Sequence, residues 1–247
     1  MNDWFLIDTL RLFGFIAAII FIWIATGYLR LRGIFRPGDA RKINHIVVLV
    51  GGSLSFGWLT PEKARVSGAI VGAVLLALVF LTCKFSDRKP FSWVFAGNTR
   101  PADAPREAYY FWSSWLLSFL ALVGIEMIFW DPAITRASAI VVGVGDGFAE
   151  PIGSRFGRHI YKIPGFRPGR TLTRSLEGSL AVALGAFLSI VLLMIYTTDF
   201  GSVRLFTTAT SIGLGAAVVE AVTPHGFDNL TVAVTVAGLF ASMNCLF

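Results

Sequence analysis

The sequence has few charged residues for its length. Only 15% of its 247 residues are Asp, Glu, Lys or Arg, whereas 55% are hydrophobic and the mean hydropathy is +0.70. A soluble domain carries about 25% charged residues, so a soluble globular fold is excluded and most of the surface must face lipid. Because one membrane span needs about 20 apolar residues, seven or eight spans fill the chain. No separate soluble catalytic domain fits, so any chemistry belongs to the spans and their loops.

Other absences narrow the class of protein. The two cysteines cannot build a disulfide framework, and no Cys/His spacing fits a zinc site. No G-x-x-x-x-G-K-[ST] loop occurs, and Gly143 and Gly145 lie in an apolar span, which excludes a dinucleotide-binding βα unit. The chain has a net charge of +6. Basic membrane proteins commonly owe such a charge to Lys and Arg in their cytoplasmic loops, so we expect no nucleic-acid partner.

We expect an all-α, polytopic integral membrane protein with about eight transmembrane helices (seven to nine) in a single domain over residues 1–247. The start, Met1-Asn2-Asp3, lacks the positive region of a signal peptide, so the first apolar run is expected to stay as a span. Oligomeric state is left open, with a homo-oligomer as one option. The expected spans are 10–29, 43–59, 66–83, 108–129, 134–152, 176–197, 205–223 and 229–246.

The distribution of Lys and Arg predicts the orientation. Segments 30–42, 84–107 and 153–175 hold five, five and six of these cations, which is 16 of the 21 in the chain. By the positive-inside rule these segments are cytoplasmic. The connection 224–228 then lies on the same side, and both termini lie outside. Segment 84–107 is proline-rich, so we expect a loop with little regular structure there.

Two acids in the fifth span are candidates for metal binding. Asp146 and Glu150 are four residues apart, on one helical face near the cytoplasmic end of the span. Acids inside a membrane are costly and are functional candidates by default. Paired carboxylates at a water interface suit Mg²⁺, which prefers oxygen ligands and shares them with phosphates. The alternative is a salt-bridged or snorkelling helix end.

Three further groups lie on the same predicted side. The segment after span five carries Arg158, Arg170, Arg174, Ser175 and Glu177, and its six cations suit a polyphosphate clamp or an anchor beside anionic lipid. Lys42 and His45 open span two, where a buried structural histidine is the plainer interpretation. Asp228 and Asn229 open span eight and could simply cap it. All of these groups are predicted at one membrane face, where a nucleotide would be found.

Four ordered motifs between residues 41 and 240 resemble a known family. The family is the CTP-dependent polyprenol kinases, which include phytol kinase, dolichol kinase and the CTP-dependent diacylglycerol kinase of fungi. The motifs are Arg41-Lys42-x-x-His45-Ile46, Gly145-Asp146-Gly147-Phe148-Ala149-Glu150-Pro151-Ile152-Gly153, Arg174-Ser175-Leu176-Glu177-Gly178-Ser179, and Asp228-Asn229-Leu230-Thr231-Val232.

The resemblance implies transfer of the γ-phosphoryl group of CTP to the hydroxyl of a membrane lipid alcohol, an isoprenoid such as phytol, a polyprenol or dolichol. Mg²⁺ is the expected cofactor. The implied catalytic residues are Asp146, Glu150, Glu177, Asp228 and His45, with Asp146, Glu150 and Asp228 as metal ligands. The implied nucleotide-binding residues are Lys42, Arg158, Arg170, Arg174, Ser175 and Asn229.

Two alternatives stay open. A phosphatidate cytidylyltransferase-like enzyme would also use CTP, but its closing motif has a His-Gly-Gly run and two aspartates, where this chain has His225-Gly226-Phe227-Asp228-Asn229. An ion-coupled transporter would use Glu126, Asp146 and Glu220 as an ion path. Transporters often show internal repeats and bind near the midplane, and this sequence shows no clear repeat.

Overall fold

The computed structural model describes residues 3–57, 59–164, 171–197, 201–224 and 226–246, which are mostly helical. They form two compact units, Met1–Phe119 and Leu120–Phe247. Among the described residues, five helices are long and apolar enough to cross a membrane: Ile7–Leu31, Pro61–Lys84, Glu107–Phe129, Leu176–Tyr196 and Ser202–Val222. The prediction of a helical integral membrane protein is therefore confirmed, while the number of spans and the side of the termini stay predictions.

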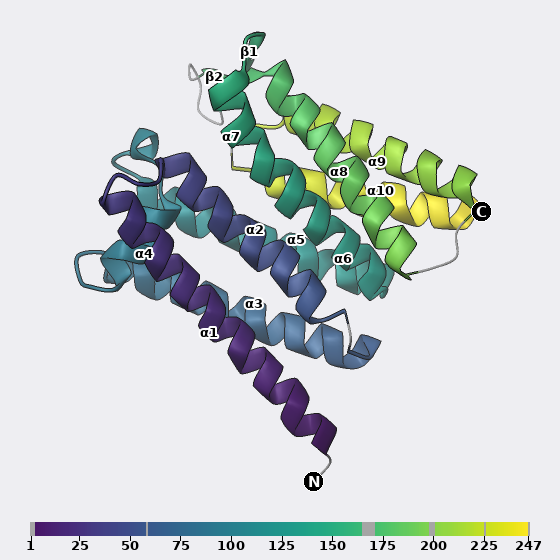
Figure 1. Cartoon of the computed structure of the whole chain (residues 1–247), viewed down its shortest axis with the longest axis horizontal. Coiled ribbons are helices and arrows are strands. Elements are labelled where there is room, and N and C mark those ends of the chain that lie inside the picture. Colours follow the sequence, from purple (N-terminus) through teal and green to yellow (C-terminus); the bar gives the residue numbers. More distant parts are fainter. Residues whose placement is uncertain (1–2, 58, 165–170, 198–200, 225, 247) are drawn as a thin grey trace. The chain divides into compact units, whose positions relative to one another are not determined.

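The first unit is built from α1 (Asp3–Leu31), α2 (Pro37–Ser55), α3 (Pro61–Lys84), α4 (Phe91–Asn98), the short 3₁₀ turn η1 (Pro101–Asp103) and the first half of α5 (Glu107–Phe129) (Figure 1). Pro37 and Pro61 each occupy the first turn of their helix, where the missing N–H has no intrahelical partner to lose. Segment 84–107 is not the unstructured loop we expected, since its apolar stretch folds into α4.

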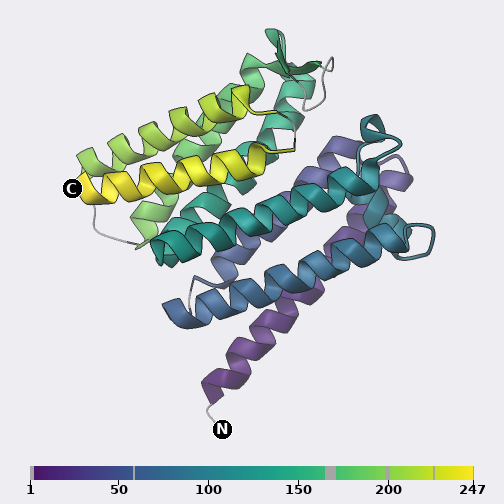
Figure 2. The same cartoon turned by 180° about the vertical axis from the view of Figure 1, so that it is seen from behind.

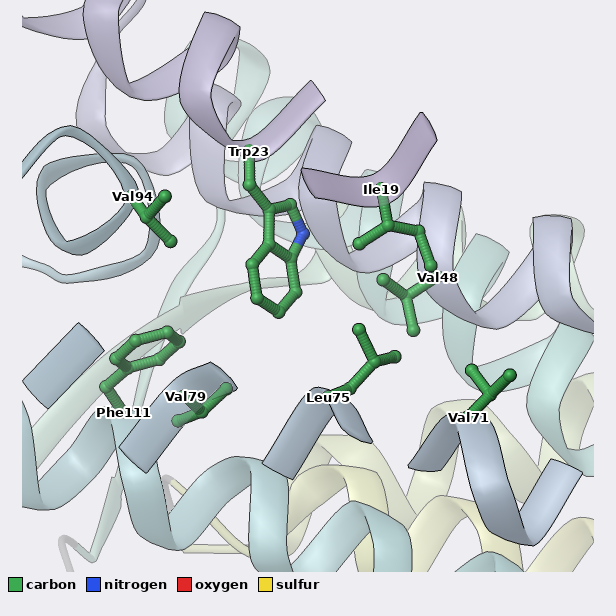
Figure 3. Packing of buried hydrophobic residues seen from close by; sticks show 8 residues of the cluster. All are labelled: Ile19, Trp23, Val48, Val71, Leu75, Val79, Val94 and Phe111. Carbon is green, nitrogen blue, oxygen red and sulfur yellow. The ribbon is translucent and has the colours of Figure 1, made fainter. Parts of the chain in front are cut away.

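The core of this unit is a cluster from five helices (Figure 3). Trp23 of α1 points into its middle and meets Trp115 edge-on, with the ring centroids 5.1 Å apart. In a bilayer, close packing of these side chains holds the helices together. The buried members are Ile19, Trp23, Val48, Val71, Leu75, Val79, Val94 and Phe111.

The second unit carries most of the predicted site. It contains α6 (Pro132–Val141), a π-helical stretch η2 (Val142–Asp146), α7 (Gly147–Phe156), strands β1 (Ile160–Pro164) and β2 (Thr171–Ser175), α8 (Leu176–Thr197), α9 (Ser202–Val222) and α10 (Asp228–Leu246). Helix α8 packs on α7 and α9, and α10 packs on α9 and α6. Figure 2 shows α9 and α10 side by side, with the strands at the end of the unit opposite the C-terminus.

Each of the eight expected spans overlaps helix, but the second, 43–59, extends beyond α2, which ends at Ser55. The fifth is a composite of α6, η2 and α7. The segment after it is not a plain loop. Strands β1 and β2 pair antiparallel, with Tyr161 opposite Arg174 and Lys162 opposite Thr173. This pairing satisfies backbone groups at the end of a helical bundle, where polar segments need partners. The hairpin was missed because its strands are short and rich in polar residues.

Candidate functional site

Asp146 is the last residue of the π-helical stretch. Its side chain is 7% exposed. A π-helical segment inside an α-helix is rare and is frequently found at functional sites. Stretch η2 contacts both α8 and α10. The backbone irregularity therefore occurs at the acid that the sequence predicted first, and it places Asp146 inside the second unit.

Glycines allow this composite helix to approach α8 closely. A Cβ atom on Gly185 would lie 3.4 Å from the Cα of Gly145, and one on Gly178 would lie 3.1 Å from the Ala149 carbonyl oxygen. A Cβ on Gly157 would lie only 2.2 Å from the Gly153 carbonyl oxygen. Small residues at such crossings bring backbones together in membrane proteins. The glycines around Asp146 therefore have a packing role.

Ser175 caps α8. Its Oγ accepts a hydrogen bond from the backbone N–H of Gly178 at 3.1 Å, which satisfies one of the unpaired donors of the first turn. The hydroxyl also lies against α7, since a Cβ on Gly153 would approach it to 3.0 Å. Ser175 is buried. The predicted contact between Ser175 and a nucleotide stays a prediction.

Arg174 of β2 is the charged centre of the site. Its guanidinium forms an ion pair with the Glu220 carboxylate and donates to the Glu220 carbonyl oxygen through the same nitrogen, Nη1. Its Nη2 donates to the Thr223 carbonyl oxygen at 3.1 Å and lies 3.9 Å from Oδ2 of Asp228. These carbonyls belong to the C-terminal end of α9, where a cation complements the helix dipole. Arg174 thus fastens the hairpin to the connection between α9 and α10.

Asp228 opens α10 in this same place. Its Oδ1 accepts from the backbone N–H of Asn229 at 3.1 Å, and an acid in the first helical turn is favoured by the helix dipole. The connection is further held by Thr223, whose Oγ1 lies 2.9 Å from that of Thr231. Both Asp228 and Asn229 are therefore fixed at the end of the unit that carries the hairpin.

Glu177 closes the base of the hairpin. Oε1 of Glu177 lies 2.8 Å from Nδ1 of His159 and accepts from the His159 backbone N–H at 3.3 Å. Arg158 and Lys162 are exposed, whereas Arg174 is turned inward. Among the cations of this segment that the structure describes, Arg174 is thus largely buried, whereas Arg158 and Lys162 are exposed. Arg170 lies outside the described residues.

A role of the carboxylates in binding Mg²⁺ stays a prediction. Within the described ranges, no group of three or more His, Cys, Asp or Glu side chains is close enough to hold a metal ion. Mg²⁺ does not need such a group, because it keeps several waters and often binds one or two carboxylates together with substrate phosphates. Asp146 and Glu150 are four residues apart, in η2 and α7 respectively. The Asp228 carboxylate lies 3.9 Å from Nη2 of Arg174. One or two of these acids, together with substrate phosphates, therefore remain candidate ligands.

Lys42 and His45 belong to the first unit and lie on α2. Lys42 is only 2% exposed and His45 is half-buried. Between them, Asn44 is completely buried, accepts from Thr26 Oγ1 at 2.8 Å and donates to Asn98 Oδ1 at 3.2 Å. This polar network joins α1, α2 and α4 around the predicted pair.

Two residues of these clusters were absent from the predicted site. Asn44 could have been found as an amide inside an apolar helix, where it needs a partner. Glu220 was considered only as part of an ion path. Glu220 could have been found as an acid near the end of a span in a chain that has more cations than acids. Ionisable groups in membranes pair with one another, so such an acid is expected to have a cationic partner.

The fold and the site define a helical membrane protein with acids and a basic hairpin at one end of one unit. No family model matches the chain, and no solved structure matches it. A phytol kinase from Synechocystis sp. (strain ATCC 27184 / PCC 6803 / Kazusa) is 35% identical to this chain over 116 residues. The match covers 47% of this chain and 47% of the relative, so the chain spans about half the length of the curated relative it matches.

Proposed function

We propose that this chain is a membrane lipid kinase of the polyprenol kinase family, which transfers the γ-phosphoryl group of CTP to the hydroxyl of an isoprenoid alcohol. The similarity to a phytol kinase supports the class of reaction. The observation that carries the proposal is that Asp228 lies at the end of the second unit that carries the hairpin with the exposed cation Lys162 and, next to it, the exposed Arg158. Acids and cations at one end of a lipid-facing bundle suit an anionic donor and a membrane-bound acceptor.

Phosphoryl transfer depends mainly on positioning the reactants and on neutralising phosphate oxygens. Asp146 and Glu150 would hold Mg²⁺, which when bound neutralises charge on the phosphates. Asp228 would be a further ligand or would accept the proton of the acceptor hydroxyl as it attacks. The exposed Arg158, with Arg170, would contact the nucleotide phosphates.

The remaining predicted residues would orient the substrates. Glu177 would keep the hairpin in place through His159, with which it already interacts. Lys42 and His45 would contact the nucleotide or position the acceptor. Ser175 and Asn229 would contact the nucleotide from the starts of α8 and α10. The lipid tail would lie among the spans, with its hydroxyl at the cytoplasmic face.

The test is the fate of label from CTP. Purified protein in lipid vesicles would be given phytol, a polyprenol, dolichol or diacylglycerol, with CTP or ATP labelled on the γ-phosphate. We expect label from CTP in an isoprenoid product, together with release of CDP. A parallel reaction would contain CTP labelled on the α-phosphate and phosphatidic acid; label that enters lipid only in this reaction, with release of pyrophosphate, would identify a cytidylyltransferase. No incorporation from either nucleotide into any of these acceptors would refute the kinase.

A further inference from the structure

The arginine of the hairpin, Arg174, is largely buried and already has partners within the protein at both terminal nitrogens. The side chains of Arg174 and Glu220 are only 13% and 9% exposed, and the Asp228 side chain is 14% exposed. Nη1 of Arg174 meets both the carboxylate and the carbonyl oxygen of Glu220, and Nη2 meets the Thr223 carbonyl. A nucleotide phosphate could bind Nη1 only by displacing the Glu220 oxygens.

Displacement would be unfavourable because it would leave a carboxylate without its cation. Breaking a buried ion pair by removing one partner is strongly destabilising, whereas the intact pair can be close to neutral. Glu220 lies within a helix that is long and apolar enough to cross a membrane, where an uncompensated charge is especially costly. The contacts of Arg174 therefore favour a role inside the protein over direct contact with phosphate.

We propose that Glu220 is a positioning residue, which holds Arg174 and through it sets the place of the Asp228 carboxylate and of the hairpin. This inference rests on the proposed function. Two carboxylates compete for one guanidinium, and Glu220 holds it at close range while Asp228 stays at 3.9 Å. Glu220 thus keeps Asp228 from collapsing onto Arg174, so that the Asp228 carboxylate can face a metal ion or a substrate hydroxyl.

Glu220→Gln tests this role in the full-length protein. Glutamine has the same length but no charge, so Arg174 is expected to turn toward Asp228 and draw its carboxylate out of place. Because small misplacements of reacting groups are costly, kcat should fall about 100-fold. The KM for CTP should change by no more than about twofold, because no phosphate contact is lost. Glu220→Asp, which keeps the charge, should restore part of kcat.

Glu62→Gln is the matched control, because Glu62 is exposed on α3 of the other unit. It should leave kcat and KM unchanged. A higher KM for CTP with an unchanged kcat in Glu220→Gln would overturn the proposal, since it would show that the cluster binds the nucleotide directly. Wild-type kinetics in Glu220→Gln would overturn it as well.

A second measurement is independent of the reaction. Thermal unfolding of the detergent-solubilised Arg174→Ala, Glu220→Gln and double variants forms a thermodynamic cycle. We expect the double variant to lose less stability than the sum of the single losses, because the two residues share one interaction. A loss of stability in the double variant equal to the sum of the single losses would show that Arg174 and Glu220 do not interact. If the wild type phosphorylates none of the lipids while the cycle shows coupling, the proposed function fails and the ion pair stands.

Discussion

The phenol oxygen of Tyr161 lies 2.7 Å from the hydroxyl oxygen of Ser179, which joins β1 to the first turns of α8. Tyr161 stands directly opposite Arg174 in the hairpin. This pair of facing residues therefore attaches the hairpin to two parts of the second unit. Tyr161 contacts α8, and Arg174 contacts the connection between α9 and α10. The position of the hairpin is set by these two side chains more than by its short strands.

Tyr161→Phe should loosen the hairpin without unfolding the unit. The change removes one hydrogen bond of a half-buried pair, which contributes about 1 kcal/mol. We expect a small drop in thermal stability and faster amide hydrogen exchange in 160–164, measured by mass spectrometry. Tyr109→Phe is the control, because Tyr109 is exposed on α5. Unchanged exchange in the strands would show that the contact with Ser179 does not hold the hairpin.

Asp146→Asn should abolish turnover while the protein still inserts and folds. Asparagine keeps the shape of the side chain but loses the charge that would bind a metal ion, so kcat should fall by about 10²–10³-fold or more. The measurement is label transfer from CTP, with size-exclusion chromatography to check folding. Asp87→Asn, at an exposed aspartate of the other unit, should behave as the wild type. Near-wild-type turnover in Asp146→Asn would remove Asp146 from the mechanism.

Removal of divalent metal should stop the reaction reversibly. We expect no label transfer in the presence of a chelator and full recovery when Mg²⁺ is added in excess. Glu150→Gln should raise the Mg²⁺ concentration that gives half-maximal activity, because a carboxylate ligand is lost. The comparison is a Mg²⁺ titration of this variant against the wild type. Full activity in chelator would rule out a metal role for Asp146, Glu150 and Asp228 together.

Gly157→Ala should destabilise the second unit. The new Cβ would lie 2.2 Å from the Gly153 carbonyl oxygen and 2.8 Å from the Ser175 hydroxyl, so the backbone must shift. Such overpacking costs about 1–3 kcal/mol. The control is Gly238→Ala on α10, whose Cβ would meet no atom within 4 Å; it should be neutral or stabilising because alanine favours helix. Equal thermal stability of the two variants would contradict the tight packing of the end of α7 against Ser175.

The sequence predicted the membrane-spanning helices because they are long apolar runs, and lipid requires every backbone group to be paired within its segment. The short helix α4 was missed because it lies in a proline-rich segment expected to be a loop. The π-helical stretch could not be predicted, since its glycines and valines have the same apolar pattern as ordinary helix. Ser175 and Glu177 were found from their motif, but the contact of Glu177 with His159 joins residues 18 positions apart and depends on the hairpin. The pairing of Arg174 with Glu220 joins residues 46 positions apart, and no local pattern reveals such a contact.

The hairpin should lie on the cytoplasmic side of the membrane. Three basic segments, one of which contains the hairpin, hold 16 of the 21 Lys and Arg residues, so the positive-inside rule places it in the cytoplasm. Ile160 and Val203 are both exposed, and they lie in connections predicted on opposite sides. In a background with Cys83 and Cys245 replaced by serine, a membrane-impermeant thiol reagent on intact cells should label Val203→Cys. It should label Ile160→Cys only after permeabilisation. Ready labelling of Ile160→Cys in intact cells would place the hairpin, and the proposed site with it, away from cytoplasmic CTP.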